Sequence, residues 1–262
     1  MRKDDILFNQ QFPFFERGSI LKKDLLQNLR DYPRDIVDLY FSNYSEGILA
    51  GSEMKIAGQQ IVIEPGIIKF AGRIYLLNDP VTIEYQPTNQ EMMIKLKFAE
   101  GTEGSDFKTW NSKLALEQGV ELAEDEFELG RFKLREGAKL RTDYNQFADF
   151  ATEYNTVNII HVKYASLEQF TIHPLIMNFF AHKILNSDTD NQFDISFAMQ
   201  ALQAKTVSRE LIKSYLKRKL ELTQKSYTNL EIYNYLAQII RQLSRYQFQT
   251  TETENEHKIL ID

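Results

Sequence analysis

The sequence predicts an α+β protein with N-terminal helices, a central antiparallel β domain (a meander or small barrel) and a C-terminal helical bundle. Two changes in the spacing of apolar residues predict this order. Apolar residues recur every three or four positions up to about residue 41, every second position from about residue 47 to 140, and every three or four again from about residue 166. The predicted parts are an N-terminal helical segment (1–45), a β-rich domain (46–160), the helical bundle (161–248) and a tail (249–262).

An amphipathic helix is expected over residues 19–41. Its first leucines step by four residues, at Leu21, Leu25 and Leu29. Ser19 stands where an N-cap accepts a hydrogen bond from the first helical turn. Pro33 is expected to break or kink the helix, because proline lacks an amide hydrogen and its ring crowds the preceding turn. Residues 34–41 then begin a second helical stretch with Pro33 at its first position.

The central region has a period of two and dense turn signals, which indicate short antiparallel strands. The predicted strands are 54–56, 61–63, 67–70, 73–77, 81–85 and 92–98. Residues 126–134 and 138–141 are expected to form a closing hairpin around Glu136-Gly137. Residues 106–119, DFKTWNSKLALEQG, are expected to form a loop followed by one or two helical turns.

Four helices are expected in the C-terminal region, joined by short turns as in a compact bundle. Pro174 fits the first turn of a helix that ends at Leu185, and Thr228 with Glu231 has the spacing of a capping box. The other predicted helices are 193–204, 208–222 and 228–246. The final residues, TTETENEHKILID, are polar and are expected to form a tail.

Composition excludes several classes of function. The 262 residues carry a net charge of −6, so the chain lacks the basic balance of a nucleic-acid binder, and we expect no nucleic-acid partner. The chain has no cysteine, which excludes disulfides, thiolate metal sites and cysteine nucleophiles. Charged residues interrupt each apolar stretch and the N-terminus lacks the pattern of an export signal, so we expect no membrane span and no Sec export.

The sequence contains no common motif of a nucleotide-binding or metal-binding site. No two of the 11 glycines are two positions apart, and none precedes a Lys-Ser/Thr pair, so neither common phosphate-binding loop is present. The four histidines lack metal-site spacing and are interpreted as helix-cap or helix-surface residues: His161, His173, His182 and His257. The stretch 187–194, SDTDNQFD, departs from a calcium loop at Phe193 and Met199. We interpret it as an interhelix turn in which Asp188 and Asp190 cap the next helix.

Two segments of the sequence are rich in charged residues and are candidate sites. An acidic run holds Glu117, Glu121, Glu124, Asp125, Glu126 and Glu128. Two carboxylates of this run could act as a catalytic acid–base pair only if an apolar environment raised the pKa of one of them. Consecutive acidic residues in a loop are more typical of a solvent-exposed surface. The basic segment 208–220, SRELIKSYLKRKL, is compatible with a DNA-binding helix or with the solvent-exposed face of a helix in the bundle. We favour the interpretation as a bundle helix. The sequence therefore predicts a protein that is not an enzyme, with no catalytic, cofactor-binding or metal-binding residue.

The segment 44–85 is punctuated by glycines at regular positions, and its form resembles a segment of phage tail and baseplate proteins, including prophage proteins of Gram-positive hosts. The residues that carry the resemblance are Glu46-Gly47, Gly51, Met54, Ile63, Pro65-Gly66-Ile67, Gly72 and Tyr75. Within it, Gly66 and Gly72 are expected to be turn residues with positive φ. No catalytic residue is implied by the resemblance.

The resemblance implies a structural component of a phage tail or baseplate, or of a phage-tail-like particle, that acts through protein–protein assembly. Its expected partners are other tail or baseplate proteins and further copies of itself. It is expected in the cytoplasm of a bacterial host during assembly and then in the tail of the virion. Aromatic residues near the N-terminal helix, among them Phe12, Phe14 and Phe15, suit an interface as well as a core.

Two alternative functions stay open at this point. One is a module at the tail tip that recognises a host-surface saccharide, which predicts a groove lined with exposed aromatic side chains. The other is a cytoplasmic carboxylate-dependent hydrolase built around residues 117–128.

Overall fold

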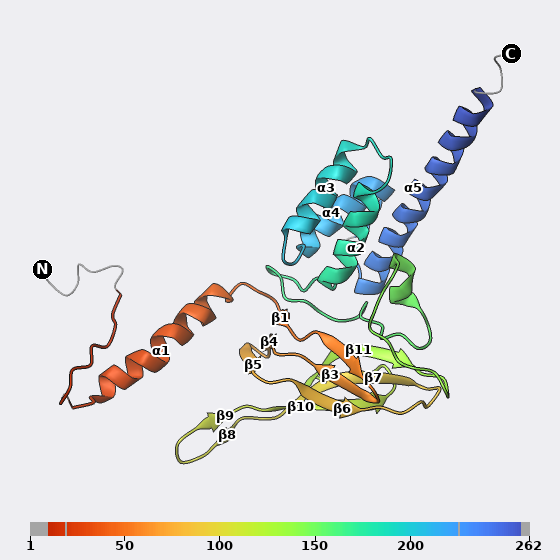
Figure 1. Cartoon of the computed structure of the whole chain (residues 1–262). Helices are drawn as coiled ribbons and strands as arrows, with labels where there is room; N and C mark the ends of the chain where they lie inside the picture. The colour runs from red at the N-terminus through yellow and green to blue at the C-terminus, as the bar shows by residue number, and fades with distance from the viewer. Residues whose placement is uncertain (1–9, 19, 225, 258–262) are drawn as a thin grey trace, which may run out of the picture. The chain divides into compact units, whose positions relative to one another are not determined.

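The computed structural model describes residues 10–18, 20–224 and 226–257, and the side chains of these ranges up to residue 243 (Figure 1). The chain divides into two units, Met1–Tyr44 and Ser45–Asp262. The predicted α+β class is confirmed, because a helix precedes a set of antiparallel sheets and a group of helices follows them. The finer boundaries predicted at residues 160 and 248 stay a prediction.

The first unit holds one α-helix, α1 (Lys23–Tyr40), which runs without interruption through Pro33. The predicted break at Pro33 is therefore wrong. A proline removes one backbone hydrogen bond, and the turns on both sides keep theirs. Lys22 precedes the helix and makes no capping bond with its side chain. The predicted N-cap, Ser19, lies outside the described residues.

The second unit begins with eleven strands arranged as small antiparallel sheets. Their bounds are β1 Gly47–Gly51, β2 Met54–Ala57, β3 Gln60–Ile63, β4 Gly66–Phe70, β5 Arg73–Leu77, β6 Val81–Glu84, β7 Glu91–Phe98, β8 Thr102–Glu103, β9 Lys108–Thr109, β10 Ser112–Gln118 and β11 Glu126–Lys133. Three sheets have three strands each, in the orders β1-β4-β5, β2-β3-β6 and β10-β7-β11, and β8 pairs with β9 (Figure 1).

The first two sheets are interleaved along the chain. β1 pairs with β4 rather than with β2, and β3 pairs with β6, so the chain passes from one sheet to the other and back. Ile61 of β3 and Ile68 of β4 consequently belong to one apolar core. The third sheet joins this core through Phe98, whose ring stacks on Phe70 with 4.1 Å between ring centroids.

Two predictions in this region are wrong. Residues expected to form helical turns before Gly119 form β10, which pairs with β7 along its whole length. Leu114 and Leu116 are two residues apart there and both pack against the core, as the period of a strand requires. The expected hairpin partner of β11, residues 138–141, forms no strand, because β11 pairs with β7 instead.

The step from β3 to β4 at Pro65-Gly66 passes close to the end of β1. A Cβ atom on Gly66 would overlap the backbone nitrogen of Ser52 and lie 2.8 Å from the carbonyl oxygen of Ala50. Gly66 has no positive φ, so its predicted role as a left-handed turn residue is wrong. The glycine is required because two backbone segments meet where it lies.

The turn between β4 and β5 has the predicted geometry. Ala71 and Gly72 both have positive φ, 47° and 71°, as a two-residue hairpin turn requires. The backbone N–H of Ala71 donates to the carboxylate of Glu46 at 2.7 Å, which holds the turn against the start of β1. The ring of Tyr75, in β5, meets Phe98 edge-on. Several residues that carry the tail-protein resemblance are therefore explained by packing.

A short helical segment, η2 (Phe147–Ala151), links the sheets to a group of four helices. These are α2 Pro174–Leu185, α3 Gln192–Gln203, α4 Arg209–Leu220 and α5 Asn229–His257 (Figure 1). The capping box at the start of α5 is confirmed, because Glu231 accepts from the N–H of Thr228 and the Thr228 hydroxyl accepts from the N–H of Glu231. α5 extends to His257, so the end predicted for this helix at residue 246 is wrong. No proline or glycine interrupts the sequence there.

Arg209 is the main polar tie among these helices. Its guanidinium group donates at 2.6 Å to the carbonyl oxygens of Phe170 and Tyr227 and also to the side chain of Asn229. The ring of Phe170 lies 4.4 Å from the guanidinium carbon. Burial lowers the pKa of Arg209. A buried guanidinium thus joins the start of α4 to the start of α5 and to the loop before α2.

Candidate interaction surface

α1 carries an apolar face that runs the length of the helix. At about 100° per residue, its apolar side chains fill one arc of roughly 160° and its polar side chains fill the rest. The apolar residues are Leu25, Leu26, Leu29, Tyr32, Pro33, Ile36, Val37, Leu39 and Tyr40. We call this surface the apolar face of α1. Such a complete division is typical of a helix that lies against another surface.

None of the described residues of α1 is buried. Leu26 is 51% exposed, Ile36 53% and Tyr40 69%. Phe12, from the segment before the helix, meets the ring of Tyr32 edge-on at 6.1 Å and is itself 72% exposed. Isolated helices of this length are marginally stable in water, and most helices gain their stability from packing of the apolar face. The described residues of the first unit leave the apolar face of α1 exposed, so this face has the properties of a contact surface.

The polar face of α1 carries charges of both signs. Its basic residues are Lys23, Arg30 and Arg34, and its acidic residues are Asp24, Asp31, Asp35 and Asp38. Amphipathic helices that lie on membranes have a polar face rich in lysine and arginine. This nearly balanced face favours a protein partner over a lipid surface. Among the described helices, none has a stretch long and apolar enough to cross a membrane.

The acidic run is tied to lysines of the neighbouring strand. Lys95, in β7, lies 2.7 Å from the Glu126 carboxylate and 2.9 Å from the Glu117 carboxylate, and Lys97 contacts both as well (Nζ–Glu126 3.2 Å). The hydrogen bond from Lys95, aided by the N–H of Ala123, lowers the pKa of Glu126 from 4.5 to about 2. A general acid of a hydrolase needs the opposite shift. These carboxylates are held ionised as partners of lysine.

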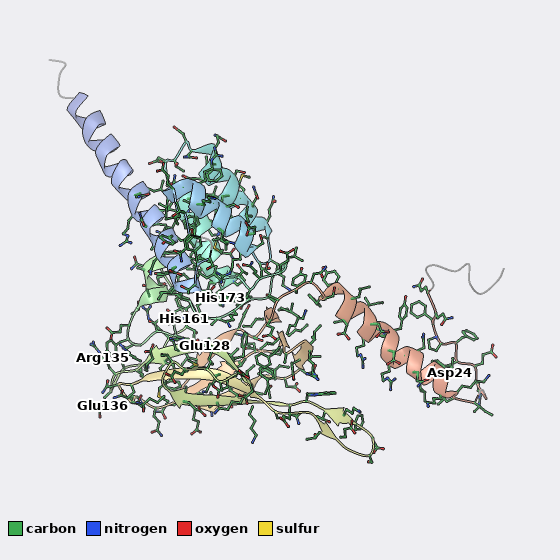
Figure 2. All side chains as sticks on the ribbon, turned by 180° about the vertical axis from the view of Figure 1, so that it is seen from behind. Asp24, Glu128, Arg135, Glu136, His161 and His173 are labelled. Atoms are coloured by element: carbon green, nitrogen blue, oxygen red, sulfur yellow. The ribbon has the colours of Figure 1, made fainter. Side chains whose placement is uncertain are left out.

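Glu128 is paired in the same way on the third sheet. Its carboxylate accepts two hydrogen bonds from Arg131, at 2.7 and 2.6 Å, and the pair is almost fully buried. Glu128 and His161 are both labelled in Figure 2, on the sheet and on the loop that follows it. Burial lowers the pKa of His161, and the positive charge of Arg131 lowers it further. His161 is therefore a neutral group packed against an ion pair.

His173 acts as a helix cap, as predicted. Its Nδ1 accepts from the N–H of Leu175 at 3.1 Å, and its Nε2 lies 3.2 Å from the hydroxyl of Tyr164 (Figure 2). Burial lowers the pKa of His173 to about 3, so the ring is neutral. His182 is exposed on α2, and the side chain of His257 lies outside the described residues. In the described part of the chain, no three His, Cys, Asp or Glu side chains are grouped as metal ligands would be.

The turn before α3 is capped by Asn191 rather than by Asp188 or Asp190. The Asn191 side chain accepts from the N–H groups of Phe193 and Asp194, because it is the residue that directly precedes the helix. The predicted capping by the two aspartates is wrong. Asp194 itself lies within the helix and is fully buried.

The basic segment is part of the helical group, as we expected. Arg209 is buried at the start of α4, and Lys219 donates to Asp194 of α3 at 2.5 Å. The hydroxyl of Tyr215 donates to the same aspartate at 2.9 Å. Arg218 lies over the ring of Phe193. These basic residues serve packing between α3, α4 and α5.

One cavity of about 470 Å³ lies between the start of the sheets and α2. Its walls include Ile48, Met54, Leu129, Ile159, Val162, Tyr144 and Tyr164. The hydroxyl of Tyr144 donates to the carbonyl oxygen of Val157, and that of Tyr164 contacts His173. A saccharide groove would present aromatic faces and free polar groups, and here both tyrosines are half-buried or buried with their hydroxyls engaged.

The ion pairs of Glu126 predict a pH dependence of stability. Because the folded pKa of Glu126 lies below its ordinary value of 4.5, the stabilisation is present above that pH and is lost as the pH falls toward about 2. Glu126→Gln is expected to lower the free energy of unfolding at pH 7, and the difference from the parent protein should shrink below pH 4.5. Urea unfolding from pH 7 down to pH 3 measures it. The exposed Glu124→Gln is the control, and a deficit that is independent of pH would contradict the prediction.

No protein-family model and no curated protein matches the chain. Among solved structures, a chain of the type VI secretion system TssK-TssF-TssG baseplate subcomplex is 11% identical, with a TM-score of 0.40, over 90% of this chain and 99% of that chain. The crystal structure of TssK is 8% identical, with a TM-score of 0.40, over 90% of this chain and 69% of that chain. The baseplate complex from the type VI secretion system is 9% identical, with a TM-score of 0.31, over 89% and 100%.

Two of these descriptions name the baseplate of the type VI secretion system, and none of the three names a phage or a Gram-positive host. Because each of these TM-scores is 0.40 or lower, the proposals below rest on the residues of this chain.

Proposed function

We propose that this protein is a structural subunit of a phage tail or baseplate, or of a phage-tail-like particle, and that it is not an enzyme. It assembles through protein–protein contacts with other subunits, in the cytoplasm of the bacterial host, and then remains in the particle. The observation that carries the proposal is the exposed apolar face of α1.

Covering this face would stabilise an assembly strongly. Full burial of one large apolar side chain contributes about 1.5–3 kcal/mol, and the face presents nine apolar residues in one continuous arc. A monomeric protein rarely leaves such a surface uncovered, and larger patches of this kind mark interaction sites. The face is therefore best explained by a partner that covers it.

The groups that a catalytic function would use are engaged in structure. Glu117 and Glu126 are paired with lysines, Glu128 is paired with Arg131, and His173 caps α2. The segment 44–85 adds the resemblance to tail and baseplate proteins, and Gly66 and Glu46 show why its form suits interleaved sheets. These features support a scaffold that presents contact surfaces.

Deletion and complementation of the gene test the proposal. Particles purified from the deletion strain are expected to lack a complete tail or baseplate in negative-stain images. A copy with Leu26→Ser and Ile36→Ser is expected to fail to restore them, because both substitutions remove exposed apolar side chains from α1. Leu76→Ser is the matched control, since Leu76 is an apolar side chain of β5, in the second unit, with a similar exposed fraction of 65%. Normal particles that do not contain the protein would refute the proposal.

A further inference from the structure

The polar face of α1 is divided lengthwise by charge. At about 100° per residue, Lys23, Arg30 and Arg34 lie next to the Val37 edge of the apolar face. Asp24, Asp31 and Asp35 lie toward the opposite edge, which Leu39 borders. We call these two strips the basic flank and the acidic flank of α1. The division arises because each base is followed directly by an acid, in Lys23-Asp24, Arg30-Asp31 and Arg34-Asp35.

Corresponding residues of the two flanks lie at nearly the same position along the helix axis. Since each acid follows its base by one residue, the members of each pair differ by about 1.5 Å along the helix axis. When two such helices lie side by side in the same direction, the basic flank of one meets the acidic flank of the other at three matching levels. In the opposite direction, like flanks meet, so that Arg30 of one helix approaches Arg34 of the other. Parallel association is therefore favoured by charge.

We propose that α1 is the contact through which copies of this chain associate, with the helices parallel, their apolar faces together and the basic flank of one against the acidic flank of the next. The inference names the partner of the apolar face and so rests on the assembly function proposed above. Because each copy offers both flanks, the arrangement closes by rotation about a common axis. An arc of roughly 160° is also wider than the seam of a two-stranded coiled coil.

Ion pairs within one copy do not oppose this arrangement. Arg30 pairs with Asp31 at 2.6 Å and Arg34 with Asp38 at 3.7 Å, and these side chains are largely exposed. Exposed ion pairs contribute little to stability, because water screens the charges and holding two long side chains in one geometry costs conformational entropy. Exchanging them for pairs between copies therefore loses little, while the apolar faces become covered.

Disulfide trapping tests the orientation in the full-length protein, which has no cysteine of its own. Leu29→Cys and Tyr40→Cys lie near the middle of the apolar face, roughly 16.5 Å apart along the helix. Parallel association predicts that each variant alone forms a disulfide with its own copies on mild oxidation. A disulfide that forms only when the two variants are mixed would show antiparallel helices and overturn the proposal.

Charge reversal tests the flanks. Lys23→Glu with Arg30→Glu and Arg34→Glu makes both flanks acidic, and Asp24→Lys with Asp31→Lys and Asp35→Lys makes both basic. Each set alone is expected to weaken self-association at least tenfold in sedimentation equilibrium, and the chain that carries both sets is expected to regain it. Unchanged association in either single set, or no recovery in the combined chain, would overturn the proposal.

The outcomes separate this inference from the proposed function. If the parent protein stays monomeric at micromolar concentration but is required for particles, the inference fails and the assembly function stands. If it binds phosphatidylcholine–phosphatidylglycerol vesicles in flotation, and Leu26→Ser with Ile36→Ser abolishes that binding, the apolar face belongs to a lipid surface and the inference fails. Particles that form normally without the protein refute the proposed function, whatever the state of association.

Discussion

Replacing Arg209 by alanine is expected to lower the free energy of unfolding by about 3–5 kcal/mol, because each buried acceptor left without a donor costs about 1–3 kcal/mol. The carbonyl oxygens of Phe170 and Tyr227 and the side-chain oxygen of Asn229 would all lose their partner. Urea unfolding followed by far-ultraviolet circular dichroism measures the change.

Two further variants serve as references for the loss of stability in Arg209→Ala. Arg209→Lys keeps the positive charge but cannot reach three acceptors in a planar fork, so it should lie between the parent protein and the alanine variant. Lys217→Ala removes an exposed basic residue of the same helix and should change stability little. If Arg209→Ala and Lys217→Ala were equally stable, the role given to Arg209 would be wrong.

Gly66→Ala is expected to lower the free energy of unfolding by about 1–3 kcal/mol, the usual range for an added group in a close-packed site. The new Cβ would overlap the backbone of Ser52 at the crossing of β1 and β4, and a backbone segment cannot turn aside as a long side chain can. Thermal unfolding measures the loss.

Gly104→Ala is the matched control for this crossing. Gly104 has no positive φ, and the nearest atom to an added Cβ is the carbonyl oxygen of Phe107 at 3.5 Å, an ordinary contact. The control should therefore unfold at the temperature of the parent protein. Equal stability of the two alanine variants would show that β1 and β4 do not meet as closely as described.

Much of the element order could be predicted from the spacing of apolar residues, because a buried face repeats with the geometry of its element. The helix from Pro174 to Leu185 and the hairpin turn at Ala71-Gly72 follow from such local rules. The errors came from interactions that are distant in the chain. Local spacing predicts helical turns at residues 112–118, because the pairing of β10 with β7 is not visible locally. It predicts a turn conformation at Gly66, because the contact of Gly66 with Ser52 is equally distant in the chain.

The candidate site was predictable only in part. The apolar stripe of α1 can be read from the sequence, but the same stripe would occur in a helix packed on its own domain. Only the structure shows that the other described residues of the first unit leave Leu26 and Ile36 exposed. In the same way, the sequence shows Glu126 within an acidic run, whereas the lysine that lowers its pKa lies 31 residues earlier, in β7.

The interleaving of the first two sheets sets the order in which this region can fold. The β2–β3 and β4–β5 hairpins are local and can form first. β1 must wait for β4, and β3 completes its hydrogen bonding only when β6 has been synthesised. Both sheets are complete only when the chain reaches Glu84, and a chain interrupted between β4 and β5 would leave a strand of each sheet unpaired along one edge.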